Sequence, residues 1–521
     1  MKKLILISFM LFTVFAHAQS NYQRKLFHTT SGVTSASVIY SNEYNTSTFV
    51  VRVIYPGTPF AAYSDVTKFT TTTGNVTSSK TFSVAGYDLK VLDVVKNNQM
   101  LYMTASLTNS TGTQPCIIKY NLSTNVTVWR KTLSINNEVL RSIAYDNAKN
   151  IFLLGNRFNA SQSKTDLMVA KLDTNGVLFW VKGIGENTLN QNQNAGAIVF
   201  NGNRELYVTC AEPNNVTQSS VLRLDSAGTI LTSKTITGST NKFFQSFATI
   251  LKGKLVTVDR SITSSPSPAE GPILMRMLDT NLTTITSKTL AAGIIIQDIY
   301  SNNTDLLVSG VPAPTGYGFK VIRFDTTFVI KGSRHFSKIQ APTSSFSNLT
   351  SSFIHSSNSS FHFFNPYMSD TVYLARTDIF EGVGCKDSVY NVSNAVINYT
   401  ATPFSYTTSV ITVTATTVTI PVASATYTSS SNCTALTTGI ISASNNAFIS
   451  LYPNPTNSVL NINSDAELIS GMIIRDVTGK EILSGKTNTQ INVSSLEAGV
   501  YFISLFDENE KLVCIKKFIK Q

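Results

Sequence analysis

Charged residues, histidine and tryptophan are scarce in this chain of 521 residues. Charged side chains make up only 14% of the sequence, which has five histidines and two tryptophans. The catalytic patterns HExxH and GxSxG and the phosphate-binding glycine loop do not occur. Catalysis normally needs a convergent nucleophile, acid or metal. The scarcity of such groups favours binding over catalysis.

Histidine offers few metal ligands. Beyond the first 18 residues the chain has His28, His335, His355 and His362. His355 and His362 lie in two apolar segments that we expect to form adjacent strands, where they could face each other as ligands. Packed or half-exposed strand histidines are commoner, so we predict no metal and no cofactor.

Cysteine is also rare, with five in the chain. Cys385 and Cys433 flank a Thr-rich stretch and form a candidate disulfide, which would close a loop of about fifty residues and add roughly 4 kcal/mol of stability. Cys116 and Cys210 lie in apolar strand patterns and are predicted to be small core residues. No CxxC pair indicates a zinc site.

Long apolar runs are limited to the N-terminus. Lys2 and Lys3 precede an apolar stretch at residues 4–15, which is too short to span a bilayer. We interpret residues 1–18 as a signal peptide. No later stretch predicts a transmembrane segment. The residues that define the expected cleavage site are Ala16, Ala18 and Gln19.

What the chain does contain is Thr, Ser and Asn in abundance, which suits β-strands with polar outer faces. The formal net charge is +11. The basic residues are spread along the chain, so nucleic acid is not favoured as a partner. A solvated cationic surface explains the charge, and acidic glycans or lipopolysaccharide remain physically compatible partners.

A short pattern recurs along the middle of the chain: apolar, any residue, basic, apolar, Asp, often with Gly following. The clearest copies end in Asp173 and Asp225, which begin the turns at 173–176 and 225–228. Weaker copies occur on either side, separated by 46 to 54 residues. The last positions of the seven copies are 70, 121, 173, 225, 279, 325 and 378.

Each repeat has the same internal order of four strands. Examples are the apolar segments 89–95 and 100–105, then the strand with the basic residue and Asp, then 177–182. Four antiparallel strands in about fifty residues are typical of one β-propeller blade. The sequence therefore predicts an all-β chain with a seven-bladed propeller.

Closure of the predicted ring involves the N-terminal segment. Residues 22–27 resemble the fourth strand of other repeats, such as 128–133. We expect them to form the outermost strand of the seventh blade, beside residues 371–390. Pairing the first and last parts of the chain would remove an exposed edge.

The repeated charged positions predict structural roles. Asp173, Asp225, Asp279 and Asp325 could suggest calcium, but a calcium loop needs several oxygen ligands within a short span. Sequences such as Asp-Thr-Asn-Gly favour turns in which the carboxylate accepts backbone N–H groups. The repeated Lys or Arg is expected to meet carboxylates or aromatic rings.

Residues 385–447 differ from the repeats and are rich in Thr, Ser, Val and Ala. Two alternatives are open. The segment forms one or two strands on the last blade, joined by the Cys385–Cys433 link, or it is a stiff extended spacer. Residues 442–446 are interpreted as a flexible linker.

The C-terminal segment has its own motifs, in the order Leu-Tyr-Pro-Asn-Pro, a Thr-Gly-Lys turn, Leu-Glu-Ala-Gly-Val-Tyr-Phe and a basic end. This order resembles the type A C-terminal sorting domain of the type IX secretion system of Bacteroidetes. The resemblance implies export, with the final strand and its lysines read by the secretion machinery. The motif residues are Pro453, Asn454, Pro455, Gly479, Gly499, Tyr501, Lys516 and Lys517.

The repeats in turn resemble propeller domains of large exported Bacteroidetes proteins that carry K-x-D-x-x-G-x-x-x-W units. The resemblance spans about residues 22–390, although only Trp129 and Trp180 keep the tryptophan. It implies a propeller fold and adds little chemistry.

Together these patterns predict a signal peptide at 1–18, a seven-bladed propeller at 19–390, an extension and linker at 391–447 and a small β-sandwich sorting domain at 448–521. The protein is expected to pass through the periplasm and be secreted or held at the outer-membrane surface. The leading hypothesis is a non-catalytic binding or adhesion module for a glycan or surface protein. The alternative is a propeller-scaffold hydrolase or lyase acting on a polymer.

Overall fold

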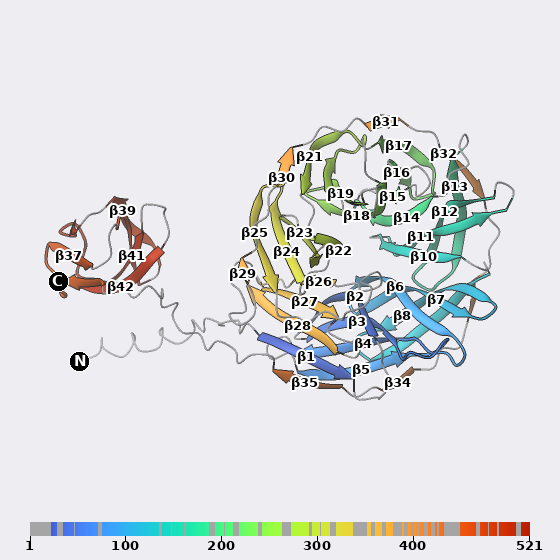
Figure 1. Cartoon of the computed structure of the whole chain (residues 1–521), viewed down its shortest axis with the longest axis horizontal. Helices are drawn as coiled ribbons and strands as arrows, with labels where there is room; N and C mark the ends of the chain where they lie inside the picture. The colour runs from blue at the N-terminus through green and yellow to red at the C-terminus, as the bar shows by residue number, and fades with distance from the viewer. Residues whose placement is uncertain are drawn as a thin grey trace, which may run out of the picture. The chain divides into compact units, whose positions relative to one another are not determined.

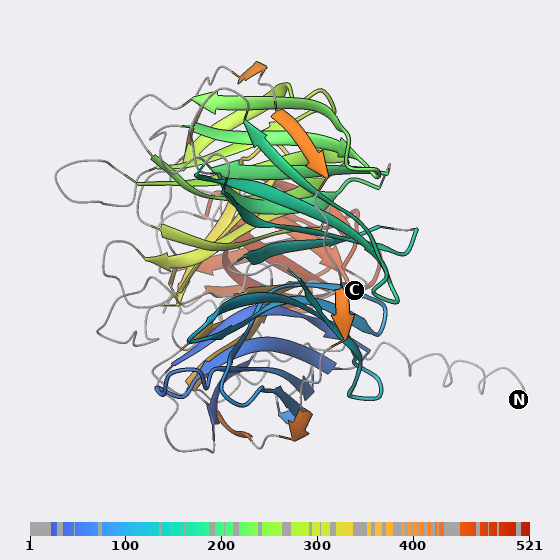
Figure 2. The ribbon, with the colours of Figure 1, turned by 90° about the vertical axis from the view of Figure 1, so that its right-hand side faces the viewer.

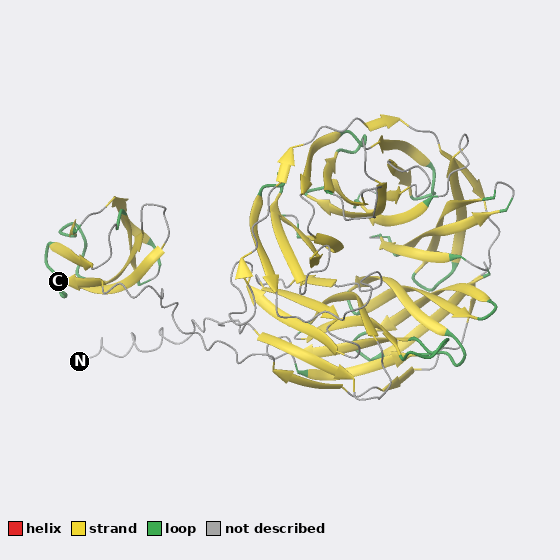
Figure 3. Ribbon diagram, in the orientation of Figure 1, coloured by secondary structure: helices red, strands yellow, loops and turns green. Residues whose placement is uncertain are grey.

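A computed structural model of the protein contains two compact units, Met1–Leu436 and Thr437–Gln521. The described residues form strands, turns and loops, and no helix (Figure 3). They are 22–28, 35–45, 47–70, 75–134, 138–146, 148–160, 163–186, 193–202, 204–211, 218–237, 242–262, 272–290, 294–302, 304–312, 319–336, 352–355, 360–366, 371–378, seven short strands between 388 and 431, 449–464, 469–477, 479–486, 489–506 and 512–521.

The first unit contains seven five-stranded sheets among its described residues. Each innermost strand contacts the innermost strand of the next sheet, and the last of them contacts the first, so the sheets close a ring (Figure 1). The all-β propeller class predicted from the sequence is therefore confirmed. The innermost strands are β2 (Ser35–Tyr44), β6 (Asp88–Asn97), β10 (Val139–Tyr145), β14 (Asn194–Phe200), β18 (Lys242–Leu251), β22 (Ile294–Ser301) and β26 (Ser352–His355).

Three further strands follow outward in each sheet, and they are antiparallel to one another. The second strands are β3 (Ser47–Tyr55), β7 (Met100–Asn109), β11 (Asn150–Asn159), β15 (Glu205–Ala211), β19 (Lys254–Ile262), β23 (Asp305–Pro312) and β27 (Ser360–Pro366). The third are β4 (Tyr63–Thr70), β8 (Gly112–Asn121), β12 (Lys164–Asp173), β16 (Gln218–Asp225), β20 (Ile273–Leu278), β24 (Phe319–Asp325) and β28 (Thr371–Asp378). The fourth are β5 (Val76–Phe82), β9 (Val126–Leu133), β13 (Leu178–Glu186), β17 (Ile230–Thr237), β21 (Thr284–Leu290), β25 (Ile330–Phe336) and β1 (Tyr22–His28).

Strand β1 joins the two ends of the repeat region. It pairs with β28 in antiparallel register, with Tyr22 opposite Arg376 and Phe27 opposite Thr371. The predicted pairing of residues 22–27 with the last repeat is confirmed. The predicted outermost position is wrong, because β35 (Tyr427–Ser431) pairs with the other edge of β1.

The segment between Ser388 and Ser431 supplies a fifth strand to every one of the seven sheets. It visits the sheets in the reverse of chain order and lies on the outside of the ring (Figures 1 and 2). We call these strands the belt. Its strands are β29 (Ser388–Val389), β30 (Asn394–Val396), β31 (Ala401–Pro403), β32 (Tyr406–Val410), β33 (Ala415–Thr417), β34 (Val422–Ser424) and β35.

The belt corrects both expectations for this segment. It is neither one or two strands on the last blade nor a free spacer, and the blades have five strands instead of four. The physical reason is the open outer edge of each fourth strand, whose unpaired N–H and C=O groups accept an added strand. Residues 391–431, assigned from the sequence to an extension, therefore contribute strands to the propeller sheets.

The apolar core lies between neighbouring sheets. In β11, Leu153 and Leu154 are both fully buried although successive residues of a strand point to opposite faces. Leu154 packs in a cluster with the following sheet, which includes Leu206, and Leu153 packs with the preceding sheet, which includes Ile117. Stacking around a ring thus buries both faces of the inner strands, which explains their continuous apolar sequences.

The repeated Asp begins a tight turn between the third and fourth strands. The Asp173 Oδ1 atom accepts hydrogen bonds from the backbone N–H groups of Asn175 and Val177, at 2.9 and 2.8 Å. Gly176 in this turn has a positive φ of 76°. Asp225 accepts the same two bonds in the next sheet. The predicted turn role of the repeated Asp is confirmed.

The repeated basic residue connects neighbouring sheets. Its side chain donates to a backbone carbonyl in the turn between the third and fourth strands of the next sheet, and Trp129 Nε1 donates to the Thr174 carbonyl in the same way, at 3.0 Å. These bonds join the first five sheets in succession. They run from Lys68 to Leu122, from Lys119 to Thr174, from Lys171 to Ser226 and from Arg223 to Thr280.

Arg276 departs from this arrangement. It lies three residues before Asp279, one position earlier than Lys171 lies before Asp173, so it occupies the other face of its strand. There it is fully buried and pairs with Asp259 at 2.5 Å. The copy of the pattern that ends at Asp279 therefore lacks a basic residue at the repeated position, and Lys288 donates instead to the carbonyl of Phe328 in the following turn.

The second unit consists of a three-stranded and a four-stranded sheet. One cluster of buried residues, which includes Leu460 and Ile474, joins the two sheets into a sandwich. The first sheet contains β36 (Ile449–Tyr452), β37 (Val459–Ser464) and β40 (Gln490–Asn492). The second contains β39 (Glu481–Lys486), β38 (Gly471–Asp476), β41 (Gly499–Phe506) and β42 (Leu512–Lys520).

Candidate functional site

A cavity of about 310 Å³ lies at the centre of the ring, because six innermost strands line it. In all six strands the register with the second strand shifts at one point. Such bulges redirect a side chain. The residues at the shifts that also line the cavity are Ile39, Leu92, Arg141, Gly196, Ala197 and Gln297.

A chain of hydrogen bonds links three innermost strands beside this cavity. The Asp93 carboxylate accepts from the Ser142 hydroxyl at 2.8 Å and from the Ile143 N–H at 2.9 Å. The Ser142 hydroxyl oxygen accepts in turn from the Ile198 N–H at 3.2 Å. These contacts fix the backbone immediately after Arg141.

Burial raises the pKa of Asp93 to about 6, and hydrogen bonds from Ile143, Ser142 and Val94 oppose the rise. The carboxyl group therefore changes charge at a mildly acidic pH. Its oxygens are already engaged by three protein donors, so Asp93 holds neighbouring strands together.

Arg141 differs from the other shifted residues because it carries a charge. Its side chain is exposed to the cavity, and none of the described residues pairs with its guanidinium. Surrounding protein lowers the pKa of Arg141 through desolvation. The sequence analysis missed this residue because it lies outside the repeated motif.

A larger cavity of about 860 Å³ lies further along three of the same strands, at the carboxyl ends of β2, β6 and β22. We call it the mouth. Amide side chains dominate its lining, together with two tyrosines and one pair of opposite charges. The lining residues are Asn42, Glu43, Tyr44, Asn45, Lys96, Asn97, Asn98, Gln99, Met100 and Tyr300.

Polar contacts pre-arrange the mouth. The Asn42 amide donates to the Tyr40 hydroxyl at 2.8 Å, and the Asn42 oxygen accepts from the Glu43 N–H at 2.7 Å. Burial raises the pKa of Tyr300 to about 12, so its hydroxyl keeps its proton at neutral pH. Burial lowers the pKa of Lys96, and the charge of Glu43 opposes this shift.

The candidate histidine pair is not brought together. Strands β26 and β27 are adjacent as expected, but His362 is opposite Ile354 and His355 is opposite Phe361. By this register, positions 355 and 362 fall on opposite faces of the sheet. Within the described ranges, no group of three or more His, Cys, Asp or Glu residues could hold a metal ion.

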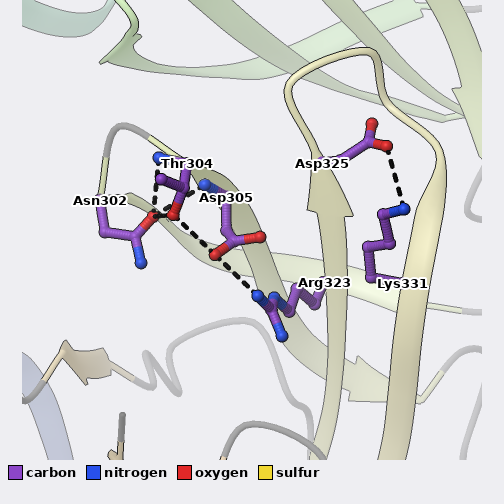
Figure 4. A network of polar contacts seen from close by, with 6 residues as sticks. All are labelled: Asn302, Thr304, Asp305, Arg323, Asp325 and Lys331. Carbon is purple, nitrogen blue, oxygen red and sulfur yellow. Dashed lines mark hydrogen bonds and ion pairs between the residues drawn. The ribbon is translucent and has the colours of Figure 1, made fainter. Parts of the chain in front are cut away.

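Charged residues at repeated positions elsewhere form ion pairs and hydrogen bonds within the fold, as the sixth sheet shows (Figure 4). Arg323 pairs with Asp305 at 2.9 Å. Asn302 accepts hydrogen bonds from Thr304 and Asp305, which orders the turn before β23. A repeated charged position in this sheet thus stabilises the fold.

In the second unit, the motif at Pro453, Asn454 and Pro455 follows strand β36. Both X–Pro bonds are cis. The Asn454 side chain accepts from the Ile519 N–H at 2.9 Å and donates to the Lys517 carbonyl at 3.2 Å. The motif is therefore attached to the final strand.

The other motif residues lie on the four-stranded sheet. Gly479, with φ of 85°, forms the turn between β38 and β39. Gly499 begins β41, in which Tyr501, Ile503 and Leu505 are buried while Val500 is exposed on the other face. Tyr501 stacks on Phe518 at 5.7 Å and donates to the Glu497 carbonyl at 3.0 Å, while Lys516 and Lys517 are exposed on β42.

Several predicted residues lie outside the described residues. These are the expected cleavage-site residues Ala16, Ala18 and Gln19 and the candidate disulfide partners Cys385 and Cys433. Cys116 and Cys210 are buried, as predicted for small core residues, and neither forms a disulfide.

Residues 450–521 match the family described as the secretion system C-terminal sorting domain. The chain ends in a type IX sorting domain. The protein is therefore exported to the cell surface or secreted, and its sorting domain implies handling by the type IX secretion machinery. Within the described ranges, no helix is long and apolar enough to cross a bilayer.

Three solved structures are reported as similar to this chain. The β-propeller domain of the trilobed protease from Pyrococcus furiosus is 12% identical, with 57% of this chain and 85% of that chain covered and a TM-score of 0.34. PorZ, a surface component of the type IX secretion system of Porphyromonas gingivalis, is 11% identical, with 92% and 70% covered and a TM-score of 0.30. The polysaccharide lyase Uly1 is 9% identical, with 69% and 100% covered and a TM-score of 0.37. No curated protein sequence matches the chain.

Proposed function

We propose that this exported protein is a non-catalytic binding module whose mouth holds a polyhydroxylated ligand such as a glycan. The observation that carries the proposal is the lining of the mouth. Asn and Gln amides both donate and accept hydrogen bonds, which suits hydroxyl groups, and Tyr44 and Tyr300 add apolar ring surface. The volume of about 860 Å³ falls in the usual range for small-molecule sites.

Pre-organisation supports this proposal. The Asn42 amide is held by Tyr40, so binding loses less side-chain entropy than it would with free amides.

Asp93, whose pKa is raised in the central cavity, is the candidate for acid catalysis by an alternative polymer hydrolase or lyase. Its carboxylate is occupied by three protein donors, which favours a structural role over catalysis.

The test measures binding of neutral and acidic oligosaccharides to the purified full chain by calorimetry. Tyr300→Ala and Asn42→Ala should each weaken binding by about tenfold, through lost ring contact and hydrogen bonds. Phe158→Ala, which removes an exposed ring outside the mouth, should leave affinity unchanged. Equal affinities in all four proteins would overturn the proposed mouth site, and turnover of any oligosaccharide would overturn the non-catalytic assignment.

A further inference from the structure

Arg141 is the one positively charged residue among the described residues that line the central cavity, and the carboxyl groups of Asp93 and Asp298 line it too. It occupies the bulge between Leu140 and Ser142, the two residues that β10 pairs with β11 on either side of the shift. The equivalent shifts in β2 and β6 present Ile39 and Leu92, which are apolar. The guanidinium is therefore a feature of one sheet and does not belong to the repeat that builds the ring.

The backbone that carries Arg141 is rigidly held. Asp93 bonds to Ser142 and Ile143 on one side, and Ser142 bonds to Ile198 on the other. The backbone position of Arg141 is consequently set by three neighbouring strands, and the side chain is exposed to the cavity.

Two other arginines of the sheets, Arg52 and Arg323, have acidic partners. Arg52 pairs with Asp65 at 2.6 Å, and Arg323 pairs with Asp305 at 2.9 Å. Arg141 has no such partner among the described residues, although desolvation lowers its pKa. A guanidinium taken partly out of water without a partner costs free energy, and an entering anion would recover it.

The two cavities share strands. Ile39, Leu92 and Gln297 line the central cavity, and the mouth begins within a few residues of each along β2, β6 and β22. A ligand bound at the mouth can therefore extend one substituent toward the ring centre.

We propose that Arg141 forms an anion subsite in the central cavity that receives a carboxylate or sulfate substituent of a glycan held at the mouth. This inference deepens the proposed function and names its ligand class, an acidic glycan. A guanidinium presents two parallel N–H donors, which match the two oxygens of a carboxylate or sulfate. Amides and tyrosines at the mouth would hold the hydroxyl groups of the same ligand.

The experiment compares three probes by calorimetry with the full chain: a maltooligosaccharide, an oligogalacturonate and a sulfated oligosaccharide. Arg141→Met should weaken binding of the charged probes by about ten- to a hundredfold and leave the neutral probe unchanged. Arg141→Lys should restore part of the loss. Arg475→Met removes the same charge from the other unit and should have no effect. The two charged probes identify which oxyanion is preferred.

Equal loss of neutral and charged probes in Arg141→Met would overturn the anion subsite, because a structural defect would cause it. Equal binding of all probes by the unmodified protein would also overturn it, while the mouth site would stand. A separate arm measures the melting temperature in sodium sulfate. The stabilisation by sulfate should be smaller in Arg141→Met than in Arg475→Met, and an identical response would count against the subsite even if no glycan binds.

Discussion

The inner strands of a sheet and its belt strand differ in how far apart they lie in the sequence. In the first six sheets, from β2 to β25, the four inner strands follow one another directly in the chain, so their contacts are local. The belt strands pair with partners far away in sequence, as β34 does with β5. Non-local pairing must overcome more loop-closure entropy. The blades thus provide their own local stability, whereas the belt depends on the ring already being formed.

Belt and blades also close the ring differently. Strand β1 closes it once by pairing with β28. The belt begins on the sheet of β25 and ends on β1, and those two sheets are neighbours. It therefore makes nearly a full turn and covers the outer edge of each sheet, where unpaired backbone groups would otherwise invite association with other chains.

The largest effect is expected inside the blades, at the ion pair of Arg276 and Asp259. Both side chains are fully buried, and Ser246 also donates to Asp259 at 2.6 Å. Arg276→Met leaves the carboxylate buried without its charged partner, so the free energy of unfolding should fall by about 3–5 kcal/mol. Urea denaturation of the propeller measures this loss.

The double variant Arg276→Met with Asp259→Leu provides the control. Replacing both charges by apolar groups should recover most of the stability, because no unpaired charge is left. A single variant that loses less than about 1 kcal/mol would show that the buried pair adds little to the blades.

The next effect concerns the belt. Cys385 precedes β29 by three residues and Cys433 follows β35 by two, and these strands lie on neighbouring sheets. We predict that the two cysteines form a disulfide that joins the ends of the belt. Such a link would add up to about 4 kcal/mol by the chain-entropy argument.

Peptide mapping without reductant should find the Cys385–Cys433 bond, and reductant should lower the melting temperature of the unmodified protein. Cys385→Ser should lack this response to reductant. Finding both cysteines as free thiols in the exported protein would show that the belt is held by strand pairing alone.

The repeated motif made the blades predictable from the sequence. The belt and the candidate site carry no repeated motif, so the sequence analysis missed them. The types of residue at Asp173 and Lys171 recur because several turns and several junctions between sheets use the same hydrogen bonds, and their regular spacing predicted the repeated blades. The belt strands have two to five residues and no such period, since only their partners decide their pairing. Arg141 lies where the repeats differ, and aligning the innermost strands on their apolar positions is the signal that would have found it.

A third prediction concerns the innermost strands. Asp93 has a pKa raised to about 6, so between roughly pH 4 and pH 6 the folded protein binds more protons than the unfolded chain. Stability should therefore fall as pH rises through this window, by at most about 3 kcal/mol. In Asp93→Asn this pH-dependent term should disappear, whatever the absolute stability. Urea denaturation from pH 4 to pH 7 gives the slope, and an unchanged slope in the variant would contradict the assignment.

The smallest loss of stability is expected at a hydrogen bond between neighbouring sheets, and this test shows whether such junctions unfold independently of the belt. Lys171 donates to the Ser226 carbonyl at 3.2 Å and lies 5.5 Å from the centre of the Phe152 ring. Lys171→Met should therefore cost only about 1 kcal/mol, and hydrogen exchange should rise in the turn at 225–228. Lys486→Met, an exposed change in the other unit, should alter neither. Protection of β32, the belt strand on the same sheet as Lys171, should stay as it is, because its bonds are to β13. If protection of β32 fell together with the turn, the junctions and the belt would form one cooperative unit, and the distinction between a self-stable ring and a dependent belt would fail.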